Sequence, residues 1–155
     1  MRVTLEPMSN ERYVDWLPVQ VEEYAKDKIE AGIWTESTAR DLSAAEMAAL
    51  LPDGLSTTGH DVFIGAVDDT EVGNLWLWTH ETPAGKETFI YNIEVDPGQQ
   101  GKGYGRGLVE ACERWCSKRG VAAIRLNVFG QNAKAIGLYE TSGFTTTNLN
   151  MMKRL

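Results

Sequence analysis

The sequence predicts an α+β fold in which helices cover both faces of a mixed, mostly antiparallel central sheet. Strand-like segments joined by short turns fill residues 62–95, which is typical of antiparallel hairpins. Helical segments lie before and after these strands, and a strand–helix–strand unit over residues 89–129 predicts one parallel pair. The chain has 155 residues, of which 43% are hydrophobic, so we expect one domain over residues 1–155 with a substantial core.

The N-terminal part predicts a short strand followed by an amphipathic helix. Residues 2–6 have strand character, and Ser9 or Asn10 can cap the helix that follows. One stripe of this helix carries Tyr13, Leu17, Val21, Tyr24 and Lys28. Pro18 lies inside the helix and is expected to kink or split it, because proline lacks the N–H of an interior helical bond.

A second helical region is predicted from about Ser37 to Leu51. Ser43 and Glu46 have the spacing of a capping box within this region. The helix is expected to end at residues 52–54, because proline and glycine favour a turn there.

Three strands are predicted next, over Val62–Val67, Val72–Trp78 and Thr88–Val95. The turns between them, at residues 68–70 and 83–85, are short enough for antiparallel hairpins.

The C-terminal half predicts a helix over residues 104–119, which ends at a glycine, and then a strand over Val121–Phe129. Because a helix connects this strand to the one before it, the two strands should run parallel. A helix over residues 133–142 follows, and Thr145–Leu155 has strand character.

A glycine-rich turn separates the strand that ends at Val95 from the helix that follows. Glycines occupy alternate positions 101, 103, 105 and 107, so a run of backbone N–H groups has little side-chain cover. The first turn of a helix has unpaired N–H donors and a partial positive charge, which suit a phosphate or pyrophosphate. Lys102 and Arg106 can add positive charge, so we interpret this turn as an anion site rather than a flexible surface loop.

Two common phosphate motifs do not fit this turn. A Walker loop needs Ser or Thr after its Gly-Lys pair, and Gly103 stands there. A dinucleotide fingerprint needs G-x-G-x-x-G, and neither register supplies the last glycine. The turn instead reads Q-x-x-G-x-G, with Gln100, Gly103 and Gly105 at the fixed positions.

With this motif the chain resembles the GNAT superfamily of N-acetyltransferases. A second element supports the resemblance, since residues 126–144 show the family's order of strand, Asn, helix, Tyr and Gly-Phe. The likeness is specific over residues 90–144 and implies the GNAT fold, a homodimer in many members, and acetyl-CoA as cosubstrate. It implies the following cofactor-binding residues: Ile93, Val95, Gln100, Gly101, Lys102, Gly103, Tyr104, Gly105, Arg106, Asn127 and Asn132.

Tyr139 is the first catalytic candidate. It lies two helical turns after Asn132, so both side chains project from one helix face. A thiol pKa near 8.5 and a phenol pKa near 10 are close enough for a tyrosine to protonate the departing thiolate. The alternatives are an aromatic side chain packed in the core and, for Asn132, a helix N-cap.

Glu94 is the second catalytic candidate, as the base that accepts the amine proton directly or through water. Strand alternation predicts Asn92 and Glu94 on the face opposite to Phe89, Tyr91, Ile93 and Val95. The resemblance implies that the N–H of Val95 bonds the thioester oxygen. Glu94 as an ordinary solvated carboxylate, with water as the base, is the alternative.

Asn127 stands where some ribosomal-protein acetyltransferases of the superfamily have a catalytic Glu. Since an Asn cannot serve as a base, that mechanism is not expected here, and a ribosomal-protein substrate is disfavoured.

The two halves of the chain differ in charge, which bears on the partners. Residues 1–80 carry 15 acidic and 5 basic residues, whereas residues 81–155 carry 7 and 10. This asymmetry disfavours nucleic acid and suits an anionic cofactor with a cationic amine acceptor, although solvated helix faces explain part of it. We expect at most two of five aromatic residues to line the acceptor pocket: Tyr24, Trp34, Trp76, Trp78 and Tyr91.

The sequence contains no pattern of a metal site, a disulfide framework or a membrane span, and the cytoplasm is expected. Cys112 and Cys116 lie one helical turn apart and are expected to be partly buried thiols. The predicted function is direct acetyl transfer from acetyl-CoA to a primary amine on a small molecule or a peptide. The alternative is a non-catalytic CoA-binding module that senses or regulates.

Overall fold

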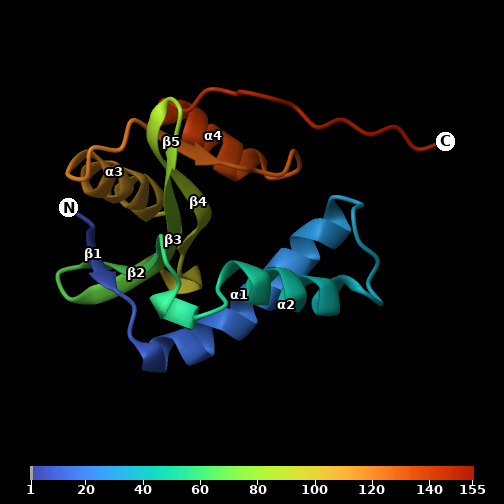
Figure 1. Ribbon diagram of the computed structural model, residues 1–155, viewed down its shortest axis with the longest axis horizontal. Helices are drawn as coiled ribbons and strands as arrows, with labels where there is room; N and C mark the ends of the chain where they lie inside the picture. Colours follow the sequence, from blue (N-terminus) through green and yellow to red (C-terminus); the bar gives the residue numbers. More distant parts are fainter. Residues whose placement is uncertain (1) are drawn as a thin grey trace.

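The computed structural model describes residues 2–155 and has one five-stranded sheet in the order β1-β2-β3-β4-β5. The strands are β1 (Thr4–Pro7), β2 (His60–Val67), β3 (Thr70–Thr82), β4 (Gly85–Val95) and β5 (Ala123–Leu126). Neighbouring strands are antiparallel except for β4 and β5, which are parallel. The α+β prediction with a mixed sheet and a parallel crossover is confirmed (Figure 1).

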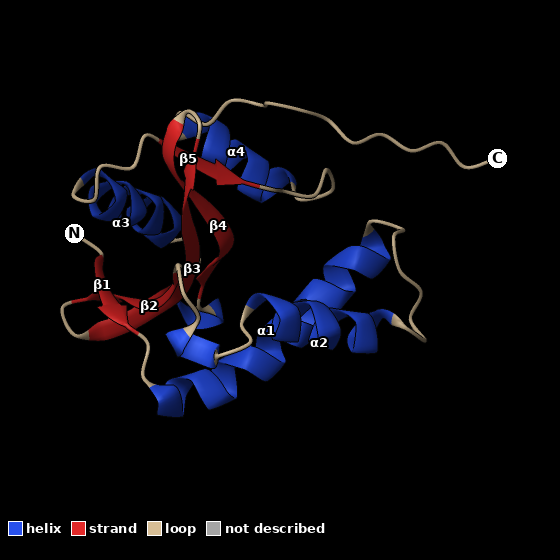
Figure 2. Ribbon diagram, in the orientation of Figure 1, coloured by secondary structure: helices blue, strands red, loops and turns tan. Residues whose placement is uncertain are grey.

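Helices lie on both faces of this sheet, as predicted (Figure 2). They are α1 (Asn10–Glu30), α2 (Ala39–Leu50), α3 (Tyr104–Ser117) and α4 (Ala133–Thr141), with short 3-10 turns at Gly54–Ser56 and Pro97–Gln99. One core cluster joins α1 and α2 to the face of the sheet that carries Trp76. A second joins α3 to the opposite face, which carries Leu75 and Leu77. No helix within residues 2–155 has the length and hydropathy needed to cross a membrane.

Helix α1 begins at the predicted position and runs through Pro18 without a break, so the predicted split is wrong. Ser9 caps the helix, since its Oγ accepts a hydrogen bond of 3.1 Å from the N–H of Arg12. Pro18 and Val14, whose carbonyl oxygen loses its helical partner, are both exposed, so the lost hydrogen bond lies on the outer side of the helix.

Ser43 does not form the predicted capping box. Helix α2 begins after Thr38, which places Ser43 in its second turn, and this side chain is fully buried. Its hydroxyl donates to the carbonyl oxygen of Val21 on α1 at 2.7 Å. The small polar residue therefore joins the two helices instead of beginning one of them.

The β2–β3 hairpin turns at Asp68 and Asp69, whose φ angles of 48° and 62° are those of a type I′ turn. Such a turn matches the twist of the flanking strands, so the hairpin needs only two connecting residues. Strand β3 continues past its predicted end at Trp78 to Thr82. Strand β4 begins at Gly85, before its predicted start at Thr88.

A β-bulge at Tyr91 overturns the predicted alternation along β4. Trp76 is opposite Asn92 and Leu77 is opposite Ile90, so Tyr91 is an extra residue without a partner on β3. An extra residue reverses the facing of all later side chains. As a result, Ile93 lies on the α3 face with Ile90, whereas Phe89 and Tyr91 share the α1 face with Glu94.

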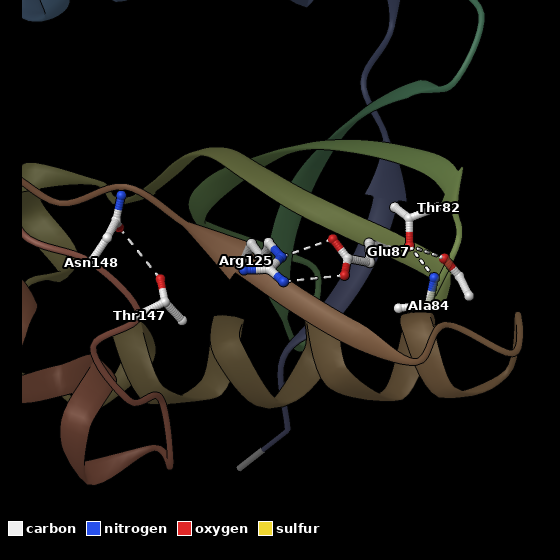
Figure 3. A network of polar contacts seen from close by, with 7 residues as sticks. Thr82, Ala84, Glu87, Arg125, Thr147 and Asn148 are labelled. Atoms are coloured by element: carbon white, nitrogen blue, oxygen red, sulfur yellow. Dashed lines mark hydrogen bonds and ion pairs between the residues drawn. The ribbon is translucent and has the colours of Figure 1, made fainter.

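The parallel pairing of β4 with β5 is short and covers only Glu87–Ile90 against Ala123–Leu126. The predicted strand over residues 121–129 therefore ends early. An ion pair of 2.8 Å between Glu87 and Arg125 ties the two strands together (Figure 3). Beyond Ile90, β4 has no strand on this side, and the two chains diverge.

No strand forms over Thr145–Leu155, contrary to the prediction. A strand needs a partner for its backbone groups, and this segment has none in the sheet. Figure 1 shows the segment leaving α4 and extending away from the body of the molecule.

Candidate active site

A cleft of about 370 Å³ opens between α1, β4 and the segment that leads from β5 to α4. It brings together five of the predicted site residues, which are Ile93, Glu94, Asn127, Asn132 and Tyr139. The cleft forms because β4 and β5 stop pairing after Ile90 and Leu126 and then diverge. This divergence leaves open space where the sheet would otherwise continue. The predicted cofactor-binding residues 100–106 are not part of this cleft lining and lie in the glycine turn that follows β4.

The backbone of Val95 faces the side of β4 from which β5 has diverged. The N–H of the next residue, Asp96, donates to the carbonyl oxygen of Val72 on β3 at 3.0 Å. The N–H and C=O groups of successive residues in a strand point to opposite sides, so those of Val95 point away from β3. The carbonyl accepts instead from Nε2 of Gln100 at 3.3 Å, which ties the glycine turn to the strand.

The glycine turn presents a row of free donors. The backbone N–H groups from Gln100 to Arg106 make no hydrogen bond to any atom of residues 2–155. Gly101 and Gly103 have φ angles of 78° and 86°, which favour glycine. A Cβ at either position would meet nothing within 4 Å, so the space above the turn is open. This geometry fits a phosphate or pyrophosphate at the start of α3.

The other two glycines serve close packing rather than ligand access. A Cβ at Gly105 would lie 3.1 Å from Cδ2 of Leu138 on α4. At Gly107 it would lie 2.6 Å from Cγ2 of Val3. These glycines let α3 approach α4 and the segment before β1, and so they hold the turn in place.

The two cations of the turn are exposed and bonded to the protein itself. Lys102 donates from Nζ to Oε1 of Gln99 at 2.9 Å. Arg106 donates to Oγ1 of Thr141 at 2.9 Å, which links α3 to the end of α4. Lys102 and Arg106 belong to the glycine turn and the first turn of α3, so their positive charge favours an anion there.

Tyr139 lies on α4 and lines the cleft. Its ring packs edge-on against Phe144 with 5.7 Å between centroids, and burial raises the pKa of its phenol to about 12. Asn132 caps α4, since its Oδ1 accepts from the N–H of Ala135 at 3.2 Å. Asn132 also lines the cleft, so the capping role does not remove it from the site.

Glu94 is held at the base of the cleft by two buried amides. Gln20 on α1 and Asn74 on β3 each donate to Oε2 of Glu94 at 3.4 Å, and each amide residue is 5% exposed. Oδ1 of Asn74 in turn accepts from Nε1 of Trp16 at 3.0 Å and from Nδ2 of Asn92 at 2.7 Å. The Glu94 carboxylate is therefore oriented from α1 by Gln20 and from β3 by Asn74.

Gln20 and Asn74 were missed in the sequence, although a signal existed for the first. Gln20, Glu23 and Asp27 follow helical spacing and lie along one side of the cleft. Asn74 offered no such signal, because its role depends on cross-strand pairing with Glu94. Burial raises the pKa of the Asp27 carboxyl, and Glu23 and Glu30 nearby raise it further.

Three of the five aromatic candidates line the cleft, one more than expected: Tyr24, Trp76 and Tyr91. Trp76 and Tyr91 stack with 4.7 Å between ring centroids. Trp34 packs on Tyr24 outside the cleft lining, and Trp78 stacks on His80.

Cys112 and Cys116 are fully buried on α3 and lie outside the cleft lining. Their sulfur atoms are 4.0 Å apart, within the distance of a thiol–thiol hydrogen bond, and form no disulfide. Residues 2–155 contain no group of three or more His, Cys, Asp or Glu side chains arranged to hold a metal ion.

Comparison with known proteins gives a consistent result. The model of the acetyltransferase (GNAT) family matches residues 26–144. YycN, an N-acetyltransferase of Bacillus subtilis (strain 168), is 32% identical over 157 residues, with all of both chains covered. YdgE, another N-acetyltransferase of this organism, is 30% identical over 156 residues, covering 100% of this chain and 99% of YdgE. The crystal structure of YycN matches with a TM-score of 0.95 and 33% identity, covering 99% of this chain and 98% of that one.

Proposed function

Because the chain belongs to the GNAT family of acetyltransferases, we propose that it transfers an acetyl group from acetyl-CoA directly to a primary amine. One observation carries the proposal: a row of free N–H donors at the start of α3 lies next to a cleft that contains Glu94 and Tyr139. Family membership favours an enzyme over a non-catalytic CoA-binding module. A screen of amines with acetyl-CoA, followed by release of free thiol, tests the proposal.

The free donors support the choice of acetyl-CoA as the acetyl donor. Its pyrophosphate would accept hydrogen bonds from the N–H groups between Gln100 and Arg106, with Lys102 adding charge. Its pantetheine arm would follow the open side of β4 beyond Ile93, toward Asn127 and Asn132. Bound in this way, acetyl-CoA supplies an activated thioester at the cleft.

Three groups of the chain would then act on the reacting atoms. The N–H of Val95 points to the open side of β4 and would stabilise negative charge on the thioester oxygen. Glu94 would accept the proton that the attacking amine loses, and Tyr139 would donate a proton to the departing thiolate. An amine that arrives as an ammonium group first gives one proton to solvent, because only the neutral amine can attack. The neutral amine then loses its second proton to Glu94 while Tyr139 protonates the thiolate, so protons and charge balance.

The cleft supports a cationic acceptor. Three carboxylates line it, on Glu23, Asp27 and Glu94, together with stacked aromatic rings. Carboxylates attract a protonated amine, and aromatic faces favour a cation or an apolar body. We therefore propose a cationic primary amine, free or at the end of a peptide.

Replacing Glu94 by Gln is expected to lower kcat by about 10- to 100-fold. A general base typically contributes about 10²–10⁴-fold, and the loss should be smaller here because water can accept the amine proton in place of Glu94. The amide keeps the size and the contact to Gln20 and Asn74 but cannot take a proton. Glu110→Gln on the exposed side of α3 is the matched control. If only KM rises, Glu94 attracts the acceptor and the base lies elsewhere.

Replacing Asp27 by Asn is expected to raise KM for the amine by about two- to fivefold at low salt, the size of a partly exposed ion pair of about 0.5–1 kcal/mol. KM of the unmodified protein should rise with salt, because exposed charges are screened over about 8 Å at physiological ionic strength. Asp15→Asn, on the exposed side of α1, is the control. A best acceptor that is anionic, or a KM indifferent to salt, would contradict the cationic acceptor.

A further inference from the structure

His60 is the first residue of β2 and lies behind the wall of the cleft. Its side chain is half-buried and does not line the cleft, whereas Trp76 and Tyr91 do. His60 stacks on Tyr91 with 5.7 Å between ring centroids, and Tyr91 stacks on Trp76 with 4.7 Å. His60 also stacks on Trp78, its partner on β3, with 6.1 Å between centroids. The two rings of the cleft wall therefore belong to one packed group of rings that includes His60.

One hydrogen bond holds Trp76 from behind the wall. Nε1 of Trp76 donates to Nδ1 of His60 at 2.9 Å, and the indole makes no other hydrogen bond to residues 2–155. An indole N–H can only donate, so Nδ1 is the acceptor and the proton of the neutral imidazole is on Nε2. Because Trp76 is 2% exposed, water cannot replace His60 as the acceptor without opening the wall.

The backbone fixes the position of His60. Its N–H donates to the carbonyl oxygen of Thr57 at 3.2 Å, and the N–H of Thr79 donates to the carbonyl oxygen of Gly59 at 2.8 Å. A Cβ at Gly59 would lie 3.0 Å from the carbonyl oxygen of Thr79, and the φ of 79° at Gly59 favours glycine. The turn before His60 is therefore tied closely to β3, and a side chain on such a support can set the position of its neighbour.

We propose that His60 is a positioning residue for the amine acceptor, because it holds Trp76 and Tyr91 in the arrangement that the acceptor contacts. The inference rests on the proposed function, since it takes this cleft as the acceptor site. An acceptor should bind less tightly when Trp76 loses its hydrogen bond and can turn. Glu94 and Tyr139, which act on the reacting atoms, do not depend on this bond. The effect should therefore fall on KM for the amine and leave kcat unchanged.

The hydrogen bond requires a neutral His60. A protonated imidazole carries an N–H on both nitrogens and cannot accept from Trp76. Burial lowers the pKa of His60 from the ordinary value of 6.5, although the neighbouring carboxylate of Asp61 opposes this shift. The β3 rings around His60 carry no charge, and burial raises the pKa of the Tyr91 phenol on β4, which is therefore also neutral. Trp76 should thus be held at neutral pH and released only in acid.

Two substitutions separate the hydrogen bond from the packing of rings. His60→Phe keeps a ring but removes the acceptor, whereas His60→Asn places Oδ1 as many bonds from the backbone as Nδ1. At neutral pH, His60→Phe is expected to raise KM for the amine about three- to tenfold, the effect of one neutral hydrogen bond, with kcat unchanged. His60→Asn should restore KM to within about twofold of the unmodified protein. His80→Phe is the matched control, because His80 stacks on Trp78 and its Nδ1 has no hydrogen-bond partner in residues 2–155.

Three kinetic results would overturn the proposal. These are an unchanged KM in His60→Phe, an equal rise of KM in both His60 variants, and a fall of kcat without a change of KM. The second result would show that the ring, and not the hydrogen bond, supports the wall.

The indole N–H resonance of Trp76, assigned in an isotope-labelled sample, tests the contact without any acceptor. On acidification it should shift with a midpoint below pH 6.5 in the unmodified protein, and it should not shift in His60→Asn. A resonance that does not titrate, or titrates equally in both proteins, would show that His60 does not hold Trp76. A screen that finds no acetylated amine would overturn the proposed function and the acceptor role together, and the resonance distinguishes that result from a missing His60–Trp76 bond.

Discussion

Replacing Tyr139 by Phe is expected to lower kcat by about 10²–10⁴-fold and to leave the affinity for CoA unchanged. The hydroxyl makes no hydrogen bond to residues 2–155, so its removal leaves no buried group without a partner. The ring keeps its packing against Phe144, and the free energy of unfolding should stay the same. A loss of turnover therefore reports a lost proton donor and not a damaged fold. Tyr13→Phe, whose ring packs on Trp16, is the matched control.

The raised pKa of Tyr139 sets the expected pH dependence. An acid acts only in its protonated form, and a pKa of about 12 keeps this phenol protonated across the neutral and moderately alkaline range. Ionisation of Tyr139 should therefore produce no alkaline limb in kcat between pH 6 and pH 10. The raised pKa makes the phenol a weaker acid than a thiol of pKa near 8.5, so proton transfer to the thiolate is uphill, and the tyrosinate must take up a proton from solvent to complete it.

Two results would contradict this role. Unchanged turnover of the Tyr139→Phe variant with the best acceptor would make Tyr139 a packing residue. A steep alkaline limb near neutral pH that disappears in the variant would show that the phenol ionises far below the pKa expected from its burial. Steady-state kinetics from pH 6 to pH 10, with a thermal-shift measurement of CoA binding, distinguish these results.

Local sequence signals predicted most of the fold. The capping serine before α1, the short turn at Asp68 and Asp69, and the glycine turn before α3 each act within a few residues of where they stand. The parallel pairing of β4 and β5 followed from connection rules that hold for almost any strand–helix–strand unit. Such features depend little on distant contacts, which is why sequence reasoning located them.

The features that sequence reasoning missed depend on distant partners. The bulge at Tyr91 is set by how β4 packs against β3, and Tyr91 itself stacks on Trp76. The hydroxyl of Ser43 is bonded across the α1–α2 interface. The segment after Phe144 has the composition of a strand, but a strand exists only where a second one pairs with it. No window of local sequence contains these partners.

The position of Glu94 depends on a local sequence signal, and its orientation depends on contacts with residues distant in the sequence. Its place on β4 near the glycine turn was readable from the sequence, since both lie on one short stretch of chain. Its surroundings were not, because Gln20 and Asn74 come from 74 and 20 residues away in the sequence. Sequence reasoning therefore found the reactive groups more readily than the residues that orient them.

Replacing Gly103 by Asp is expected to give a Kd for CoA at least about fivefold higher than that of the Gly103→Asn variant. Gly103 caps α3 with a φ of 86°, and Asp and Asn tolerate this backbone region better than other non-glycine residues. Both are also good N-cap residues, so either variant should fold. The two side chains have nearly the same shape, and a Cβ at this position meets no other atom within 4 Å. Any difference between the variants therefore reports charge.

The expected size follows from the charge that the Asp variant adds. One negative charge about 4 Å from a phosphate costs about 1–4 kcal/mol, depending on how far solvent screens the pair, which corresponds to at least about a fivefold change in Kd. Calorimetry of CoA binding measures the difference, and added salt should reduce it because the added charge is exposed to solvent. Equal affinities of the Asp and Asn variants would mean that the pyrophosphate binds elsewhere. A difference that persists in molar salt would instead indicate a steric or conformational effect, because only the Coulomb repulsion is screened.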